Sequence, residues 1–439
     1  MRADCDGPPG AWRRATGRQA GRPLRVFLGA FGDPGHAFPM LALGVELASR
    51  GHLVTYQTWT RWRDDVQAGG MRFVAAPEYP VFPTRERPLG SRLGPYREVV
   101  PATLDTLPAL ARFGPDVVVH DILTLAPALA AELEGVPAAT LIPHVHPAPA
   151  PGRPPYSLGA RPPRTRAGAA VWRALEPAFE GGLRLGRSQL NEARRLLGLP
   201  PHRRLLGSLS ERLVLVGTLP QLEPPRDWPA HVHVVGPLIW EPAGEPVAPP
   251  EGDDPLVLVA PSTSQDPGHR LLSAALRGLA SEPVRLLGAT AGRPLRRPVP
   301  LGANARLVDW LPYGRTMPQC ALVICNAGHG TLVRALAASC PVLAVPHVGD
   351  MAENAARLVW AGAGLRLPWS LLSPRTLRLA VRRALRRPAL AARAAQLGAW
   401  AALHPAAPRA ADLVERLAIT GGRVRDPGEA AGVGLEPTT

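Results

Sequence analysis

Short apolar runs alternate with longer segments of helical period along most of this chain, and this alternation constrains the fold more than any other feature. One series of runs that read as buried strands lies at 24–29, 52–58, 115–121, 137–143, 212–218 and 232–238. A second series lies at 255–262, 284–290, 305–311, 321–328 and 341–347. Strands separated by helical segments form parallel βα units. The sequence therefore predicts an α/β protein.

Two domains are expected, because 439 residues exceed what one hydrophobic core usually supports. Residues 241–254 are dense in proline, glycine and acidic side chains and predict a linker. It separates an N-terminal domain (24–240) from a C-terminal domain (255–419), each expected to be a Rossmann-like, doubly wound parallel sheet. Ligands of such sheets bind beyond the carboxyl ends of the strands, so the domains should face each other across a cleft. Residues 1–23 and 420–439 have no periodicity and are predicted to be disordered tails.

The charge of the chain says little about its partners. The formal net charge is +15, and every basic residue is arginine, a bias that a whole genome's codon usage produces in any protein. Aromatic residues make up only 5%, whereas nucleic-acid binders interleave aromatic with basic side chains. We therefore expect no nucleic-acid partner, while phosphate-bearing small molecules remain compatible with the charge.

Cysteine spacing and hydropathy indicate a cytoplasmic protein. The four cysteines form no C-x-x-C pair and no zinc spacing: Cys5, Cys320, Cys325 and Cys340. No apolar run reaches the roughly 18 residues that a bilayer requires, and the first 23 residues do not look like a signal peptide. We expect neither a structural metal nor a transmembrane segment.

The loop after the first strand, GAFGDPGHAFPM, places His36 at the start of a helix. A neutral imidazole is suited to removing a proton from an alcohol near pH 7. Asp121 ends the strand PDVVVHD on the same edge of the sheet, where it is able to hold the other ring nitrogen. On spacing alone, a second interpretation stands beside this one, in which each side chain only caps its own helix.

Three further histidines raise the question of a metal site. His144 and His146 have the H-x-H spacing found in some metal sites, and His120 adjoins Asp121. Structural or loop roles are favoured for all three.

A glycine-rich loop in ALVICNAGHGTLVRAL carries the strongest local signal. Gly328 and Gly330 flank His329 and leave backbone N–H groups open, and Thr331 adds a hydroxyl at a helix N-terminus. Such a loop binds phosphate. A glycine-rich turn without a ligand is the alternative, because Gly-x-Gly alone is a weak signal.

Residues on either side of this loop complete a site for a sugar nucleotide. Trp310, in DWLPYG, is able to stack on a base. Asp350, Glu353 and Asn354, in PHVGDMAENAARL, offer hydrogen-bond partners for sugar hydroxyls.

These motifs resemble those of the family 1 glycosyltransferases, from about residue 24 to about residue 420. GHAFPMLALGVELASRGHLVTYQT resembles the family's Gly-His-x-x-Pro opening, and the segment from VDWLPYG to AGAGLRL resembles its nucleotide-sugar signature. The resemblance implies two facing Rossmann-like domains, the GT-B fold, in the bacterial natural-product branch of the UDP-glycosyltransferase-like enzymes. It also implies that His36 is the general base and that Asp121 supports it.

The same resemblance assigns the donor site. It implies that Trp310 stacks on the base, that Asp350 contacts the sugar, and that a set of small residues meets the diphosphate: Ser262, Thr263, Gly328, Gly330 and Thr331. Asn326 stands where many members have His, and an Asn side chain still donates a hydrogen bond to phosphate. Met351 stands where glucose-using members commonly have Gln, and it offers a sugar hydroxyl no partner, which suggests a deoxysugar.

The resemblance implies an inverting, metal-independent transfer from a UDP-sugar or dTDP-sugar, with no further cofactor, to a hydroxyl of a small hydrophobic acceptor. Acceptor choice is expected to lie in loops 78–100 and 144–175, which are rich in proline and arginine. Four alternatives stay open: a glycolipid-forming transferase in peripheral contact with the membrane, a nucleotide-sugar epimerase, a hydrolase, and a non-catalytic auxiliary subunit. Either a monomer or a homodimer fits the sequence.

Overall fold

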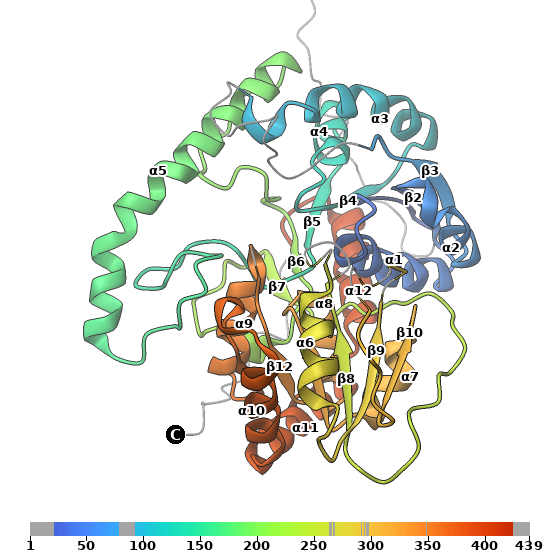
Figure 1. The fold of residues 1–439 in the computed structure, drawn as a ribbon. Helices are drawn as coiled ribbons and strands as arrows, with labels where there is room; N and C mark the ends of the chain where they lie inside the picture. The colour runs from blue at the N-terminus through green and yellow to red at the C-terminus, as the bar shows by residue number, and fades with distance from the viewer. Residues whose placement is uncertain are drawn as a thin grey trace, which may run out of the picture.

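The structure, a computed structural model, describes residues 22–78, 93–262, 266, 268–290, 292–293, 295, 298–347 and 349–424. Within these residues the chain forms two parallel sheets with helices on both faces (Figure 1). The prediction of two doubly wound α/β domains is therefore confirmed. No helix among the described residues is both long and apolar enough to cross a membrane.

The first sheet has the strand order β3-β2-β1-β4-β5-β6-β7, and every pairing in it is parallel. Its strands are β1 (Arg25–Gly29), β2 (Leu53–Thr58), β3 (Arg72–Ala75), β4 (Val117–Asp121), β5 (Ala138–Ile142), β6 (Val214–Val216) and β7 (Val232–Val234). The helices in this half are α1 (Pro34–Ser49), α2 (Arg63–Ala68), α3 (Val99–Phe113), α4 (Ala126–Leu133) and α5 (Arg166–Leu196). Two 3-10 turns, η1 (Thr60–Trp62) and η2 (Gly94–Tyr96), lie among them, and η3 (Pro220–Leu222) follows β6.

The second sheet has the order β10-β9-β8-β11-β12-β13, again with parallel pairings. Its strands are β8 (Leu256–Ala260), β9 (Arg285–Ala289), β10 (Ala305–Val308), β11 (Leu322–Cys325), β12 (Val342–Ala344) and β13 (Gly364–Arg366). The helices are α6 (Arg270–Leu279), α7 (Tyr313–Thr316), α8 (His329–Ala337), α9 (Asp350–Trp360), α10 (Pro374–Leu385), α11 (Pro388–Leu403) and α12 (Ala406–Thr420), with the turns η4 (Met317–Gln319) and η5 (Trp369–Leu371).

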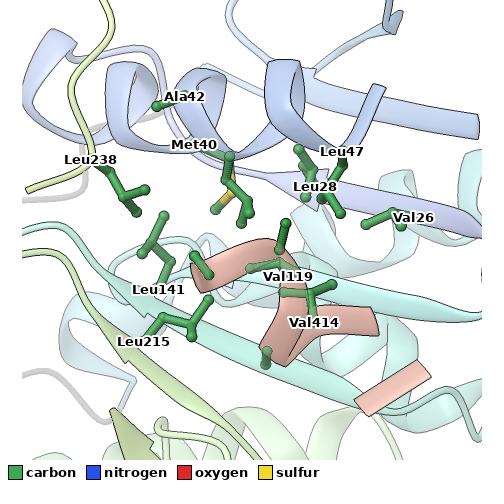
Figure 2. Packing of buried hydrophobic residues seen from close by; sticks show 14 of the residues in the cluster. Val26, Leu28, Met40, Ala42, Leu47, Val119, Leu141, Leu215, Leu238 and Val414 are labelled. Atoms are coloured by element: carbon green, nitrogen blue, oxygen red, sulfur yellow. The ribbon is translucent and has the colours of Figure 1, made fainter. Parts of the chain in front are cut away.

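Alternation of side chains along β1 builds a core on each face of the first sheet. Val26 and Leu28 point to the face covered by α1 and α12, where they meet Met40 and Val414 (Figure 2). Phe27 points to the opposite face, in a cluster with residues of α3 and α4. Because successive strand residues face opposite sides, the apolar run from Val26 to Leu28 suits a strand that is buried on both faces.

The last helix belongs by packing to the first sheet, although the predicted C-terminal domain extended to residue 419. Leu413, Val414 and Leu417 of α12 are buried in the core cluster of α1 and β1. The chain thus returns to its N-terminal half, which ties the two halves together beyond the linker. Residues 241–254 contain neither helix nor strand, as a linker should.

Both predicted tails are partly ordered, so that expectation is wrong at their inner ends. The Val424 side chain is buried, and its N–H donates to the Arg212 carbonyl at 3.0 Å. Arg22 pairs with Asp116 at 2.7 Å. Residues 1–21 and 425–439 lie outside the described residues.

The prediction that residues 144–175 form a loop is wrong from residue 166 onward. Helix α5 begins there, and the preceding residue, Thr165, is its N-cap. The helix runs for 31 residues along the periphery of the N-terminal half (Figure 1). Pro177 and four glycines lie inside it, and its buried residues all lie from Gln189 onward. Of the other predicted acceptor loop, 79–92 lies outside the described residues.

Candidate active site

The strand order of each sheet reverses at one point, and the candidate site lies between these two points. In the first sheet the reversal lies between β1 and β4, and in the second between β8 and β11. A cavity of about 240 Å³ is lined by the loops that follow these strands in both halves. Ligands of open α/β sheets bind at such switch points, where neighbouring loops diverge. The predicted interdomain cleft is therefore present, with the predicted loops around it.

His36 lies in the first turn of α1, and Asp121 is the last residue of β4. The His36 Nδ1 and Asp121 Oδ2 atoms are 2.7 Å apart, so the structure brings together the pair that the sequence predicted. The side chain of Asp121 has no exposed surface, while 14% of the His36 side chain is exposed. His36 also lines the cavity.

The capping interpretation of His36 fails, because another residue caps α1. The Asp33 side chain accepts the Gly35 N–H at 3.0 Å and forms the N-cap. The other carboxylate oxygen of Asp121, Oδ1, accepts the Leu123 N–H at 2.9 Å, which fixes the carboxylate from its far side. Asp121 thus holds both its own turn and the imidazole.

The electrostatic environment makes His36 a stronger base than a free histidine. Burial by itself lowers the pKa of His36, but the charge of Asp121 and its hydrogen bond outweigh this effect, and the pKa lies above 6.5. An ionised carboxylate only accepts, so Nδ1 carries the proton and Nε2 has its lone pair free. The imidazole is therefore held in the tautomer that removes a proton through Nε2.

The glycine-rich loop leads from β11 into α8 and opens toward the cavity. A Cβ at Gly328 or Gly330 would meet no atom of the described residues within 4 Å, so within this part of the chain both face open space. No side chain of the described residues caps the helix, and none of them therefore takes up its first N–H groups, which face a ligand in the cavity. Thr331 lines the cavity beside them. A helix N-terminus with open N–H groups and a partial positive charge binds anions.

His329, the first residue of α8, lines the cavity but has an uncharged ring. Both ring nitrogens are buried without a hydrogen-bond partner among the described residues. Burial, reinforced by the nearby His144, lowers the pKa of His329 to about 3. The ring therefore offers a polar atom to a ligand and no positive charge.

Asn326 lines the cavity, but its amide is already engaged with the protein. Its Oδ1 accepts the Ser262 N–H at 2.8 Å, and its Nδ2 donates to the Val345 carbonyl at 3.3 Å. The side chain thus joins the loops that follow β8, β11 and β12. The side chain therefore positions the loop, and the second N–H of its NH₂ group is the donor that its expected role toward phosphate would use. Ser262 lines the cavity, and Thr263 lies outside the described residues.

Trp310 and Asp350 line the same cavity, as the sequence predicted. Trp310 follows β10, and 45% of its surface is exposed, so its ring is accessible to a planar ligand. Asp350 begins α9, and the Met351 side chain lies beside it at the cavity wall.

Glu353 and Asn354 are buried and do not line this cavity, so their assignment to sugar hydroxyls is wrong. Glu353 accepts the Arg357 Nε–H at 2.8 Å. Asn354 donates to the Ala327 carbonyl at 3.0 Å and to Asp350 Oδ2 at 3.1 Å. Both residues face inward on α9, where Asn354 fixes the carboxylate that does reach the cavity.

Two of the remaining histidines are engaged inside the fold, and the third reaches the site. His120 is buried against Thr140, with 2.8 Å between Nε2 and Oγ1, as a structural role requires. His146 accepts the Ala148 N–H through Nδ1. No group of three or more potential ligands is placed to hold a metal within the described part of the chain. His144, however, lines the cavity, which the sequence interpretation missed because H-x-H spacing drew attention to metals rather than to the strand edge.

Charged residues of the linker region also reach the cavity and were missed. Glu241 accepts the Gly314 N–H at 2.9 Å and pairs with Arg334 of α8 at 2.9 Å. The proline-rich composition of the linker does not indicate that Glu241 binds residues of the C-terminal half.

Comparisons with known proteins agree with this geometry. Residues 273–418 match the family described as "Erythromycin biosynthesis protein CIII-like, C-terminal domain". The chain is 31% identical to 4'-demethylrebeccamycin synthase of Lentzea aerocolonigenes over 90% of this chain and 99% of the relative. It is 30% identical to O-mycaminosyltylonolide 6-deoxyallosyltransferase of Streptomyces fradiae over 92% of this chain and all of the relative.

Solved structures share the fold. The calicheamicin glycosyltransferase CalG4 superposes with a TM-score of 0.70 and 24% identity, over 90% of this chain and 98% of that one. The glycosyltransferase VinC, solved in complex with dTDP, gives a TM-score of 0.67 and 20% identity, over 90% and 99%.

Proposed function

Because the chain belongs to the bacterial natural-product branch of the family 1 glycosyltransferases, we propose that it transfers a sugar, with inversion and without a metal, from a nucleotide diphosphate to a hydroxyl of a small hydrophobic acceptor. One observation carries the proposal. The His36–Asp121 pair and the open N-terminus of α8 face the same cavity from opposite halves of the protein.

The acceptor side of the proposal rests on His36. Its Nε2 accepts the proton as the acceptor oxygen attacks the anomeric carbon, and the charge of Asp121 stabilises the imidazolium that forms. A single displacement of this kind inverts the anomeric configuration, because the acceptor enters opposite the departing diphosphate.

The donor side rests on the loop between β11 and α8. As the bond to the sugar breaks, negative charge grows on the diphosphate. The N–H groups around Gly330, the Thr331 hydroxyl and the helix dipole supply stabilisation for this charge. Since these donors belong to the protein, the proposed reaction needs no divalent cation. Trp310 is the residue we assign to stacking on the base.

We propose that the donor is a deoxysugar carried on dTDP or UDP. At the wall beside Asp350, Met351 offers a thioether and no hydrogen bond to a sugar hydroxyl, which suits a position where the sugar lacks one. The relative from Streptomyces fradiae is named for a 6-deoxyallosyl group, and VinC was solved with dTDP, which favours the same donor class.

The test is to incubate the protein with a panel of dTDP- and UDP-sugars and hydroxylated aromatic or macrolide acceptors. We expect a glycoside by mass spectrometry, an inverted anomeric centre by NMR, and an unchanged rate in EDTA. Incubation with donor alone separates the alternatives, because a hydrolase or epimerase would consume or convert the donor without acceptor. A retained anomeric configuration, or a rate abolished by EDTA, would refute the proposed chemistry.

A further inference from the structure

A second histidine, His144, lies in the cavity beside the base and is not used by the mechanism above. It follows β5 at the carboxyl edge of the first sheet. The His36 and His144 ring centroids are 6.2 Å apart with the rings edge to face, and both side chains line the cavity.

The tautomer of His144 follows from its contacts. Its Nδ1 lies 2.7 Å from the Val145 carbonyl oxygen, and a carbonyl only accepts, so Nδ1 carries the proton. In a neutral ring Nε2 is then a bare acceptor. The Tyr156 hydroxyl also lies 3.3 Å from Nδ1 and accepts from it in this tautomer, so the contacts within the described residues are made by Nδ1 and none by Nε2. The His144 and Tyr156 rings are stacked, with centroids 5.6 Å apart.

The surroundings of the two imidazoles push their proton affinities apart. Burial lowers the pKa of His144, and the nearby His36 lowers it further, whereas Asp121 raises the pKa of His36. Two titratable groups with opposed shifts take different roles in a site. The raised pKa of His36 favours proton uptake there, and the lowered pKa of His144 favours its neutral form.

A ring nitrogen that lacks a hydrogen-bond partner favours ligands that carry a hydroxyl able to donate to it. When the acceptor substrate displaces water from the cavity, a buried nitrogen without a partner loses its hydrogen bond to water. A ligand hydroxyl that donates to this nitrogen replaces the lost hydrogen bond. An acceptor with two hydroxyls close together is able to place one oxygen at a hydrogen-bond distance of about 2.8 Å from each nitrogen. Two hydroxyls on neighbouring carbons satisfy this condition across a 6.2 Å ring separation.

We propose that His144 determines acceptor specificity by accepting a hydrogen bond from a second hydroxyl that neighbours the reacting one. The acceptor is accordingly a diol or catechol, with one hydroxyl on His36 and the other on His144. This inference rests on the proposed function for the identity of the cavity as an acceptor site. It also makes a prediction about binding that needs no turnover.

The matched probes are luteolin and apigenin, which differ by one hydroxyl next to another on the same ring. The variants are His144→Phe, which keeps a ring against Tyr156 but has no acceptor atom, and His144→Gln, which restores one. For the wild-type protein we expect luteolin to bind at least tenfold more tightly than apigenin by calorimetry, with the same preference in kcat/KM. In His144→Phe the two affinities should become equal through weaker luteolin binding alone, and His144→Gln should recover part of the difference.

Each outcome decides the matter. Absence of a preference in the wild-type protein, or a preference unchanged in His144→Phe, overturns the proposal. The proposal is also overturned if His144→Phe changes the preference among donor sugars that differ in one hydroxyl and leaves the preference between luteolin and apigenin unchanged. If the binding preference behaves as expected but neither compound is glycosylated with any donor, the proposed function fails while the role of His144 stands. Thermal unfolding of each variant confirms that the fold is intact.

Discussion

Replacing Asp121 with Asn removes one charge and leaves the shape of the site almost unchanged. The new amide oxygen is able to keep the contact with the Leu123 N–H, and its NH₂ group then faces His36 Nδ1. Because an NH₂ group donates, it favours the tautomer with a bare Nδ1 and a protonated Nε2. That tautomer has no lone pair to offer the acceptor.

The size of the effect follows from the hydrogen bond that is lost. A hydrogen bond to a charged group is worth about 1.5–3 kcal/mol, and Asp121 has no exposed surface through which water would screen it. At about 1.36 kcal/mol for each factor of ten, kcat should fall by roughly 10- to 200-fold. Donor KM should hardly change, because the α8 loop is untouched.

The pH dependence gives a second and independent readout. The pKa of His36 lies above 6.5 only because Asp121 outweighs burial, so the Asn variant should titrate at lower pH. The neutral His36 imidazole is the active form, so kcat of Asp121→Asn should rise with pH at a lower pH than kcat of the wild type. The maximal kcat at high pH should be lower in the variant.

The matched control is Asp33→Asn, which removes another charge near His36 but preserves the N-cap of α1, since Asn caps as well as Asp. We expect its kcat to stay within about threefold of wild type. An Asp121→Asn enzyme with the wild-type plateau, or with an unshifted acidic limb, would refute the reasoning.

Three further substitutions test separate parts of the structure. Thr331→Val removes a hydroxyl from the diphosphate loop, and initial rates should show a donor KM raised by about two- to tenfold. Asn326→Ala leaves the Ser262 N–H without its partner, and calorimetry should show a loss of about 1–3 kcal/mol in the free energy of unfolding. Leu417→Ala opens a void under α12, and urea unfolding should show a loss of about 2–5 kcal/mol. Unchanged values in these three assays would contradict the assigned contacts.

Strong periodicity predicted the architecture, whereas the site residues were assigned by strand-edge reasoning together with the resemblance to family 1 glycosyltransferases. The approach of His36 to Asp121 follows from β1 and β4 being neighbours in a parallel sheet, which places the residues after both strands at one edge. The edge strands β3 (RFVA) and β13 (GLR) were not predicted, because each is short, carries an arginine and is only partly buried.

Features that depend on tertiary packing were not predictable from local pattern. The helix α12 reads as an ordinary amphipathic helix, and nothing in its sequence says that it packs on the first sheet. On α9, Asp350 reaches the cavity whereas Glu353 is buried against Arg357, because the cavity meets only the N-terminal end of this helix. The loop prediction for 144–175 failed because α5 contains proline and glycines that ordinarily argue against a helix.

The most direct test of the account compares His36→Ala with the wild-type protein in two assays on the same samples. Transfer to the acceptor should fall by roughly 10²–10⁴-fold, the contribution of a positioned base, while calorimetric affinity for the nucleotide stays within about twofold. A variant that still transfers sugar at the wild-type rate would contradict the central claim that His36 activates the acceptor.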